Sequence, residues 1–169
     1  MTSKTSLLGA AGEHFIMCEL LRRGHIAALA PQGAPNTDIV VTDLSGDRLC
    51  SIQVKARSAI ARGGGWHMHA KHEDLIGDRL FYCFVDFGKS LEDRPSVFVM
   101  QSKIVATVIS ASHRAWLSVP GKNGRQRNDS DKRQLLQDHS KAYHPEPTPY
   151  PQGWMDRYQN AWHLLGMGD

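Results

Sequence analysis

The sequence predicts an α/β (α+β) fold in which helices pack on a central β-sheet. Apolar residues recur at helical spacing over residues 7–23, and two short β-branched stretches follow at 37–41 and 51–55. Later apolar runs add two strands and a second long helix. A length of 169 residues with 41% hydrophobic residues fits one domain with a sizeable core.

The opening helix places one acid on its apolar face. Glu13 is followed at i+3, i+4 and i+7 by Ile16, Met17 and Leu20. Burying an unpaired charge is costly, so Glu13 either lies at the rim of the core or meets a cation. The alternative is that Glu13 marks the edge of a wide apolar stripe.

The stretches at 37–41 and 51–55 are predicted to form a hairpin. A Ser45-Gly46 pair between β-branched runs is typical of a turn. A turn centred on this pair sets Asp38 opposite Gln53, with Cβ atoms ~5 Å apart. Lys55 then shares the face of Gln53, and the other face is apolar. A one-residue slip of register would move Asp38 off this position.

The alternative interpretation, without a function, is that Asp38 and Lys55 form a cross-strand ion pair on a solvated sheet face. Such a pair contributes little to stability. The order of the remaining helices and strands helps to distinguish this ion pair from a functional site. Helix-forming residues are expected at 70–76, strands at 80–87 and 96–101, and a helix at 102–117.

The order of Glu13 on a helix, Asp38 on a strand and Gln53-x-Lys55 on the next strand resembles the PD-(D/E)XK nuclease superfamily. The resemblance is to a QxK variant similar to Mrr-type and Holliday-junction-resolvase-like nucleases, and it covers the first two thirds of the chain. It implies a restriction-endonuclease-like αβββαβ core with a central mixed β-sheet flanked by helices.

Two positions depart from the family pattern. Thr37 stands where a proline is usual, which affects only the shape of the strand. Gln53 stands where Asp or Glu is typical, so the site has one negative charge less. Branches similar to Mrr-type enzymes carry Gln here, and this leaves activity open.

The resemblance implies a metal-dependent DNA endonuclease. Glu13, Asp38 and Gln53, with the backbone carbonyl of Val54, would hold Mg²⁺ or Mn²⁺, which prefer oxygen ligands. Lys55 would complete the catalytic set beside the scissile phosphate. The alternatives are a catalytically inactive nuclease-fold protein that binds nucleic acid or a protein partner, and a small α+β interaction module.

DNA is the expected partner, and cleavage of both strands favours a homodimer. Arg57, Arg62 and Lys71 are candidate phosphate contacts, with solvated surface charges as the equal alternative. The net charge of +3 and pI near 8.8 permit a nucleic-acid partner without requiring one. His67, His69 and His72 could bind zinc or act as a general base, but this spacing on a strand favours a polar surface.

The composition points to the cytoplasm. The three cysteines, Cys18, Cys50 and Cys83, are expected to be buried and reduced. No signal peptide or membrane-spanning stretch is expected, and no small-molecule cofactor.

The last third is predicted to be an extension of the core. We expect a nuclease-like core over 1–119 and a charged, Pro-rich extension over 120–169. Aromatic and apolar residues at helical spacing predict an amphipathic helix over 153–165, ended by Gly166 and packed on the core or on a dimer partner.

Overall fold

The computed structural model describes residues 4–58 and 64–167, and its centre is a five-stranded mixed sheet. The strand order is β1-β2-β3-β5-β6, in which β3 and β5 run parallel and every other neighbouring pair is antiparallel. These strands are β1 (Ile26–Leu29), β2 (Ile39–Thr42), β3 (Leu49–Arg57), β5 (Leu80–Asp86) and β6 (Ser96–Gln101).

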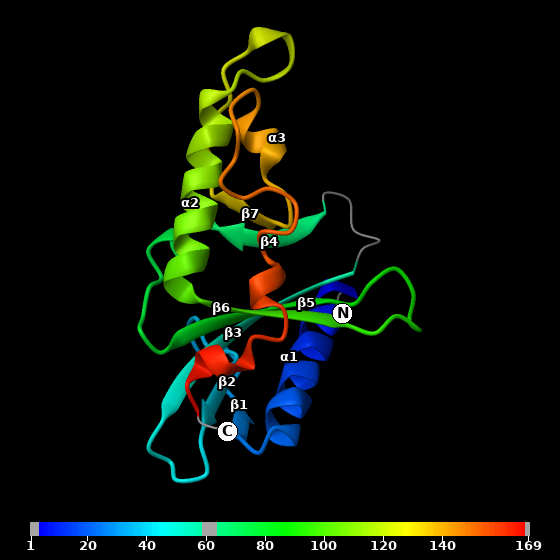
Figure 1. Cartoon of the computed structure of the whole chain (residues 1–169), viewed down its shortest axis with the longest axis vertical. Coiled ribbons are helices and arrows are strands. Elements are labelled where there is room, and N and C mark those ends of the chain that lie inside the picture. Colours follow the sequence, from blue (N-terminus) through cyan, green and yellow to red (C-terminus); the bar gives the residue numbers. More distant parts are fainter. Residues whose placement is uncertain (1–3, 59–63, 168–169) are drawn as a thin grey trace.

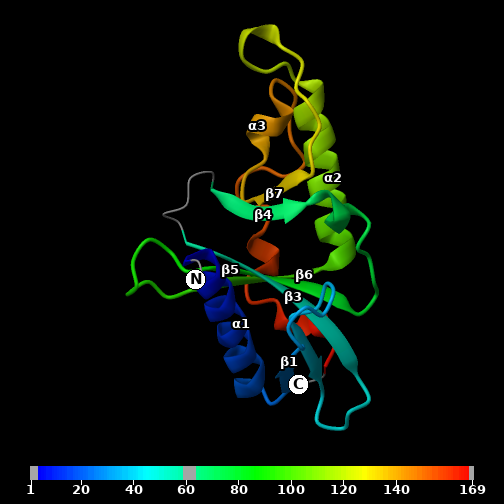
Figure 2. The same cartoon turned by 180° about the vertical axis from the view of Figure 1, so that it is seen from behind.

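Helices cover both faces of this sheet (Figure 1). Helix α1 (Lys4–Arg22) lies against one face. The other face carries α2 (Ser102–Ser118) and a two-stranded sheet of β4 (Gly65–His69) and β7 (Lys132–Leu136), seen from behind in Figure 2. The predicted central mixed sheet flanked by helices is confirmed.

The sheet separates two apolar clusters, because its strands alternate their side chains between the faces. Under α1, Ile16 and Leu20 pack on alternate residues of four strands. On the opposite face Tyr82 and Phe84 pack with Trp66 and residues of α2. Helix α1 therefore packs on the face of the sheet opposite to the one that carries the predicted catalytic residues of the strands.

The predicted register of β2 on β3 is confirmed, since Ile39 pairs with Ile52 and Thr42 with Leu49. The connection is longer than a two-residue hairpin. Residues 43–48 form it, with Gly46 at φ 80° and its N–H bonded to the Asp43 carbonyl. Because the longer loop is centred on the same point, the register is unchanged.

The connection between the parallel strands β3 and β5 differs from the expected helix. Residues 70–76 form only a 3-10 turn, η1 (Ala70–Glu73), which follows β4. Strand β4 pairs with β7, so a strand from the predicted extension completes a sheet begun in the predicted core. Strands β1, β4 and β7 add to the predicted elements, and the predicted strand position of His67 and His69 is confirmed in β4.

The predicted helix over 153–165 is wrong. This segment forms two 3-10 turns, η3 (Asp156–Tyr158) and η4 (Trp162–Leu165), the second ended by Gly166 in the left-handed region. Between them the Asn160 N–H donates to the Val97 carbonyl, and Gln159 bridges to Phe98. These bonds to β6 replace the helical ones. The segment lies on the body of the protein and contributes to both apolar clusters.

The remaining short elements are η2 (Lys122–Gly124) and α3 (Ser140–Tyr143). Cys50 and Cys83 are buried as predicted, whereas Cys18 is exposed on α1, so its predicted burial is wrong. Among the described residues, no helix has the length and apolar content needed to cross a membrane.

Candidate active site

Asp38 and Gln53 meet at the start of β2. The Nε2 atom of Gln53 donates to Asp38 Oδ2 over 2.5 Å, and the backbone N–H of Val54 donates to the same oxygen over 2.7 Å. The Asp38 N–H bonds to the Ile52 carbonyl, so Asp38 leaves the regular ladder at this point. Two N–H donors thus fix one carboxylate oxygen, and Oδ1 takes part in neither bond.

Lys55 lies two residues beyond Gln53 on β3 and shares its face of the sheet. Burial lowers the pKa of Lys55, and the positive charge of Lys71 acts in the same direction. The negative charges of Asp38 and Glu13 oppose this lowering. Lys55 is therefore a partly desolvated amine within electrostatic range of two carboxylates.

Glu13 joins this group from α1. Burial raises the pKa of Glu13, the charge of Asp38 raises it further, and Lys55 lowers it. The helix comes close to the sheet next to this residue, because a Cβ atom added to Gly12 would lie 2.7 Å from that of Ala56. Only glycine fits this contact, which fixes α1 against β3 directly beside Glu13.

Two further side chains belong to the same face, and sequence reasoning did not pair them. Tyr82 lies opposite Gln53 in the parallel β3–β5 register. Its hydroxyl is 3.0 Å from His72 Nδ1, and both side chains are buried. Burial lowers the pKa of His72 to about 4, assisted by the charge of Lys55. His72 is thus a neutral imidazole that holds the tyrosine beside the candidate site.

The three predicted phosphate contacts have different surroundings. Arg57 is held by protein groups: its Nη2 lies 2.6 Å from Asp86 Oδ2, and its guanidinium stands 4.0 Å from the Trp66 ring centre. Lys71 is exposed beside Lys55. Arg62 lies outside the described residues.

His67 and His69 are exposed on β4, in agreement with the predicted polar surface of a strand. The third histidine of that group, His72, is buried and turned toward Tyr82 instead. Within residues 4–58 and 64–167, no group of three or more His, Cys, Asp and Glu side chains is arranged to hold a metal ion. A zinc site built from these histidines is therefore not observed there.

The donor set around Asp38 still suits a hard divalent cation. Mg²⁺ keeps several waters and needs only one or two protein carboxylates. Asp38 and Glu13 are two carboxylates whose charges repel each other, and Gln53 adds a neutral amide. A bound divalent cation would offset that repulsion, so Asp38, Glu13 and Gln53 are the residues that would hold it.

No family model and no curated protein matches this chain. Among solved structures it is similar to the bacterial homing endonuclease I-Ssp6803I, with a TM-score of 0.51 and 16% identity over 98% of this chain and 92% of that one.

A second match is Hjc, a Holliday junction resolvase from the archaeal hyperthermophile Archaeoglobus fulgidus, with a TM-score of 0.44 and 14% identity over 80% of this chain and 86% of that one. At such low identity, structural similarity establishes only the fold. This conclusion rests on the match to the homing endonuclease. The chain therefore shares the fold of that homing endonuclease, and the predicted nuclease-like fold is confirmed.

Proposed function

We propose that this protein is a metal-dependent DNA endonuclease that hydrolyses phosphodiester bonds. The observation that carries the proposal is the meeting of Asp38, Gln53 and Lys55 on one sheet face, with Glu13 brought within electrostatic range by α1. A surface ion pair would not account for this group, because Lys55 is partly desolvated and Asp38 is fixed by two N–H donors.

Each residue has a role that follows from its surroundings. Asp38, Glu13 and Gln53 would hold Mg²⁺ or Mn²⁺, which when bound activates water and polarises the phosphate. Val54 fixes the orientation of the Asp38 carboxylate through its backbone N–H. Lys55 contacts the scissile phosphate, where its positive charge offsets the negative charge that develops during attack by water.

We also propose that basic side chains near Lys55 contact DNA and that the protein acts as a homodimer. Lys71 is exposed next to Lys55 and can neutralise a neighbouring phosphate. Arg62 is a further candidate phosphate contact from its sequence position alone, whereas Asp86 and Trp66 already occupy the guanidinium of Arg57. A homodimer would present two sites to the two strands of a duplex.

The test is cleavage of supercoiled, linear and four-way-junction DNA in Mg²⁺ and in EDTA. Asp38→Asn preserves the acceptor for Gln53 and Val54 but removes the charge, so it should reduce cleavage by ~100-fold or more, as should Lys55→Ala. Asp47→Asn in the exposed loop and Lys103→Ala on the exposed side of α2 are the matched controls. Cleavage that persists in EDTA, or equally in all four variants, contradicts the proposal.

One observation favours a second function, a nuclease-fold protein that binds DNA without cutting it. The amide nitrogen of Gln53 faces Asp38, where a carboxylate would otherwise face a cation. In that case the same assays show no product in Mg²⁺ or Mn²⁺. Salt-dependent DNA binding that weakens in Lys71→Ala would then remain.

A further inference from the structure

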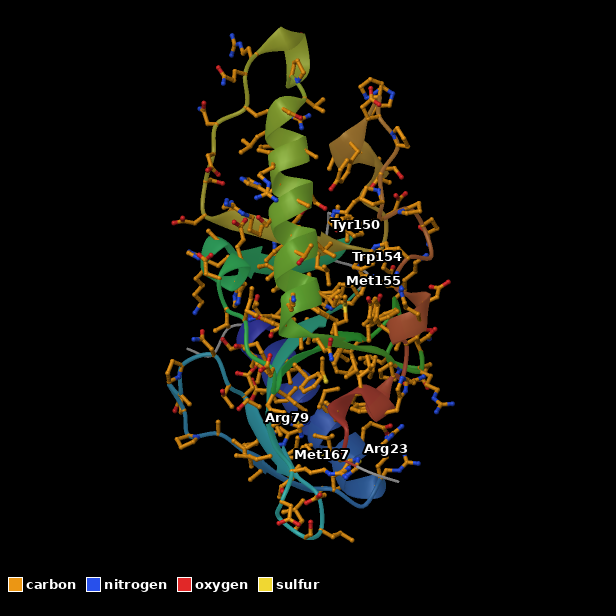
Figure 3. The ribbon with its side chains drawn as sticks, turned by 60° about the vertical axis from the view of Figure 1, so that its left-hand side comes forward. Arg23, Arg79, Tyr150, Trp154, Met155 and Met167 are labelled. Atoms are coloured by element: carbon orange, nitrogen blue, oxygen red, sulfur yellow. The ribbon has the colours of Figure 1, made fainter. Side chains whose placement is uncertain are left out.

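A cavity lies beyond the C-terminal end of α1 and shares no residue with the candidate active site. Its volume is ≈ 560 Å³, and its walls come from the turn between α1 and β1, from the turn before β3, from η4 and from the residues directly after η4. Figure 3 shows Arg23 and Met167, which both line it, at the lower end of the molecule.

The polar side chains of this cavity all carry N–H groups. They are two guanidinium groups, two imidazoles and one indole, from Arg23, Arg48, His25, His163 and Trp162. Among the lining residues that the structure describes, none is Asp or Glu. A wall rich in cationic donors and free of carboxylates is complementary to an anion.

The two guanidinium groups are held in place partly by other lining residues and partly by carboxylates outside the lining. Arg23 Nη1 lies 2.6 Å from Glu19 Oε2, and its guanidinium stands 4.4 Å from the Trp162 ring centre. Arg48 Nη1 donates to the Gly166 carbonyl over 3.0 Å, with Asp43 3.8 Å from its Nε. These bonds fix the side chains and use part of each five-donor fork.

A third guanidinium approaches the same wall. Gly166 ends η4 at φ 63°, and a Cβ atom built on it would lie 3.5 Å from Arg79 Nη1. Arg79 is itself fixed by a 3.0 Å bond from its Nε to the Leu49 carbonyl. Three arginines from distant parts of the sequence therefore converge beside the cavity.

We propose that this cavity binds a phosphate-bearing ligand, either a free nucleotide or the terminal phosphate of a nucleic-acid strand. Arginine forks match the geometry of phosphate oxygens, and the bonds from several such forks are charge-assisted. The volume is within the range of small-ligand sites, which extends from ~300 to ~1,000 Å³. The two sources share the phosphate chemistry, and the test below distinguishes them.

Trp162 supplies a built-in reporter of occupancy. Its Nε1 is buried and has no hydrogen-bond partner among the described residues. By contrast, the indole N–H of Trp66 donates to the Val85 carbonyl and that of Trp154 to the Leu136 carbonyl. An anion beside Arg23 should shift the indole resonance of Trp162 and leave those of Trp66 and Trp154 in place.

The experiment is a titration followed by ¹H–¹⁵N NMR of the full chain carrying Asp38→Asn, without divalent cations. The probes are inorganic phosphate, AMP and a 5′-phosphorylated trinucleotide, with sodium chloride at matched ionic strength as the blank. Trp162→Phe assigns the indole signal. We expect a saturable shift of the Trp162 indole resonance with all three probes. Whichever of AMP and the trinucleotide binds more tightly shows whether the ligand is a free nucleotide or a strand end.

Arg48→Ala should weaken binding roughly tenfold, as loss of a charge-assisted bond does. Arg22→Ala is the matched control, because Arg22 also pairs with Glu19 but is exposed and does not line the cavity. No Trp162 shift, the same shift with sodium chloride, or equal weakening in both variants would overturn the proposal. Since the test uses no metal and no cleavage, its outcome is independent of nuclease activity.

Discussion

Gln53 donates its side-chain amide to Asp38 over 2.5 Å, at the position where the nuclease pattern that the sequence resembles has a carboxylate. The amide therefore satisfies Asp38 without a cation. An acid at position 53 would place two carboxylates at that separation, which is favourable only with a cation or a shared proton between them. The glutamine therefore stabilises the Asp38 carboxylate through a hydrogen bond, and the candidate site has one negative charge less than it would with an acid at position 53.

Gln53→Glu should make stability dependent on metal. In EDTA we expect the melting temperature to fall, because the variant loses the bond to Asp38 and gains a repulsion, together about 2 kcal/mol. Mg²⁺ at millimolar concentration should restore it. Differential scanning calorimetry with and without Mg²⁺ measures both. Gln134→Glu on the exposed face of β7 is the control, and an equal response in the two variants contradicts the metal site.

Lys55→Met should separate stability from activity. Burial lowers the pKa of Lys55 despite the nearby Asp38 and Glu13, so its charged form is disfavoured in the folded protein. Methionine keeps the length of the side chain and removes the charge. We expect an unfolding free energy equal to wild type or higher by about 1 kcal/mol, with cleavage lost. Urea unfolding and a plasmid assay test this, and a large loss of stability would show that Lys55 is chiefly an ion-pair partner.

The hairpin could be predicted because its register depends on a simple symmetry. Alternation along 51–55 fixes which residues share a face, and a turn centred on Ser45-Gly46 gives the same pairing whether the loop has two residues or six. Asp38 and Gln53 therefore meet as predicted, even though the Asp38 N–H leaves the regular ladder. Local pattern was sufficient for this part of the site.

Contacts between distant segments could not be predicted in the same way. Tyr82 lies beside Gln53 only through the parallel register of β5, and His72 reaches it only because η1 returns over that face. The spacing of Trp162 and Leu165 fits an α-helix, but the bond from Asn160 to Val97 breaks it. The periodicity of apolar residues indicates which side chains are buried. Hydrogen bonds between distant segments determine the backbone conformation in which they are buried.

The stability of the fold should decrease as the pH falls from 7 to 5, because burial lowers the pKa of His139 to about 4. An unfolded histidine titrates near 6.5, so between these two values the unfolded state binds a proton that the folded state does not. Protonation at Nε2 would also remove the acceptor for the Leu136 N–H. The expected contribution of His139 over this range is about 2 kcal/mol.

Urea unfolding at pH 7 and pH 5 measures this loss. His139→Gln should lose about 2 kcal/mol less than wild type over the same interval, since glutamine does not titrate. His67→Gln, on the exposed face of β4, should follow wild type. His72 titrates in the same direction, so some dependence on pH remains in the His139 variant. Identical slopes in wild type and His139→Gln would contradict a neutral buried imidazole at this position.

Two glycines on α1 provide a matched test of how the helix positions Glu13. A Cβ atom at Gly12 would lie 2.7 Å from the Cβ of Ala56, whereas one at Gly9 meets nothing within 4 Å. Gly9→Ala should stabilise the protein by about 0.5–1 kcal/mol through helix propensity. Gly12→Ala should destabilise it by about 1–3 kcal/mol, because overpacking moves α1 away from β3.

The same displacement should reach the candidate metal site, since Glu13 follows Gly12 directly. We expect Mg²⁺ affinity, measured by isothermal titration calorimetry, to fall several-fold in Gly12→Ala and to stay at the wild-type value in Gly9→Ala. Gly12→Ala combined with Ala56→Gly removes the clash and should recover both stability and affinity. Recovery of stability without recovery of affinity would show that Glu13 is not a metal ligand and lies at the rim of the core for packing alone.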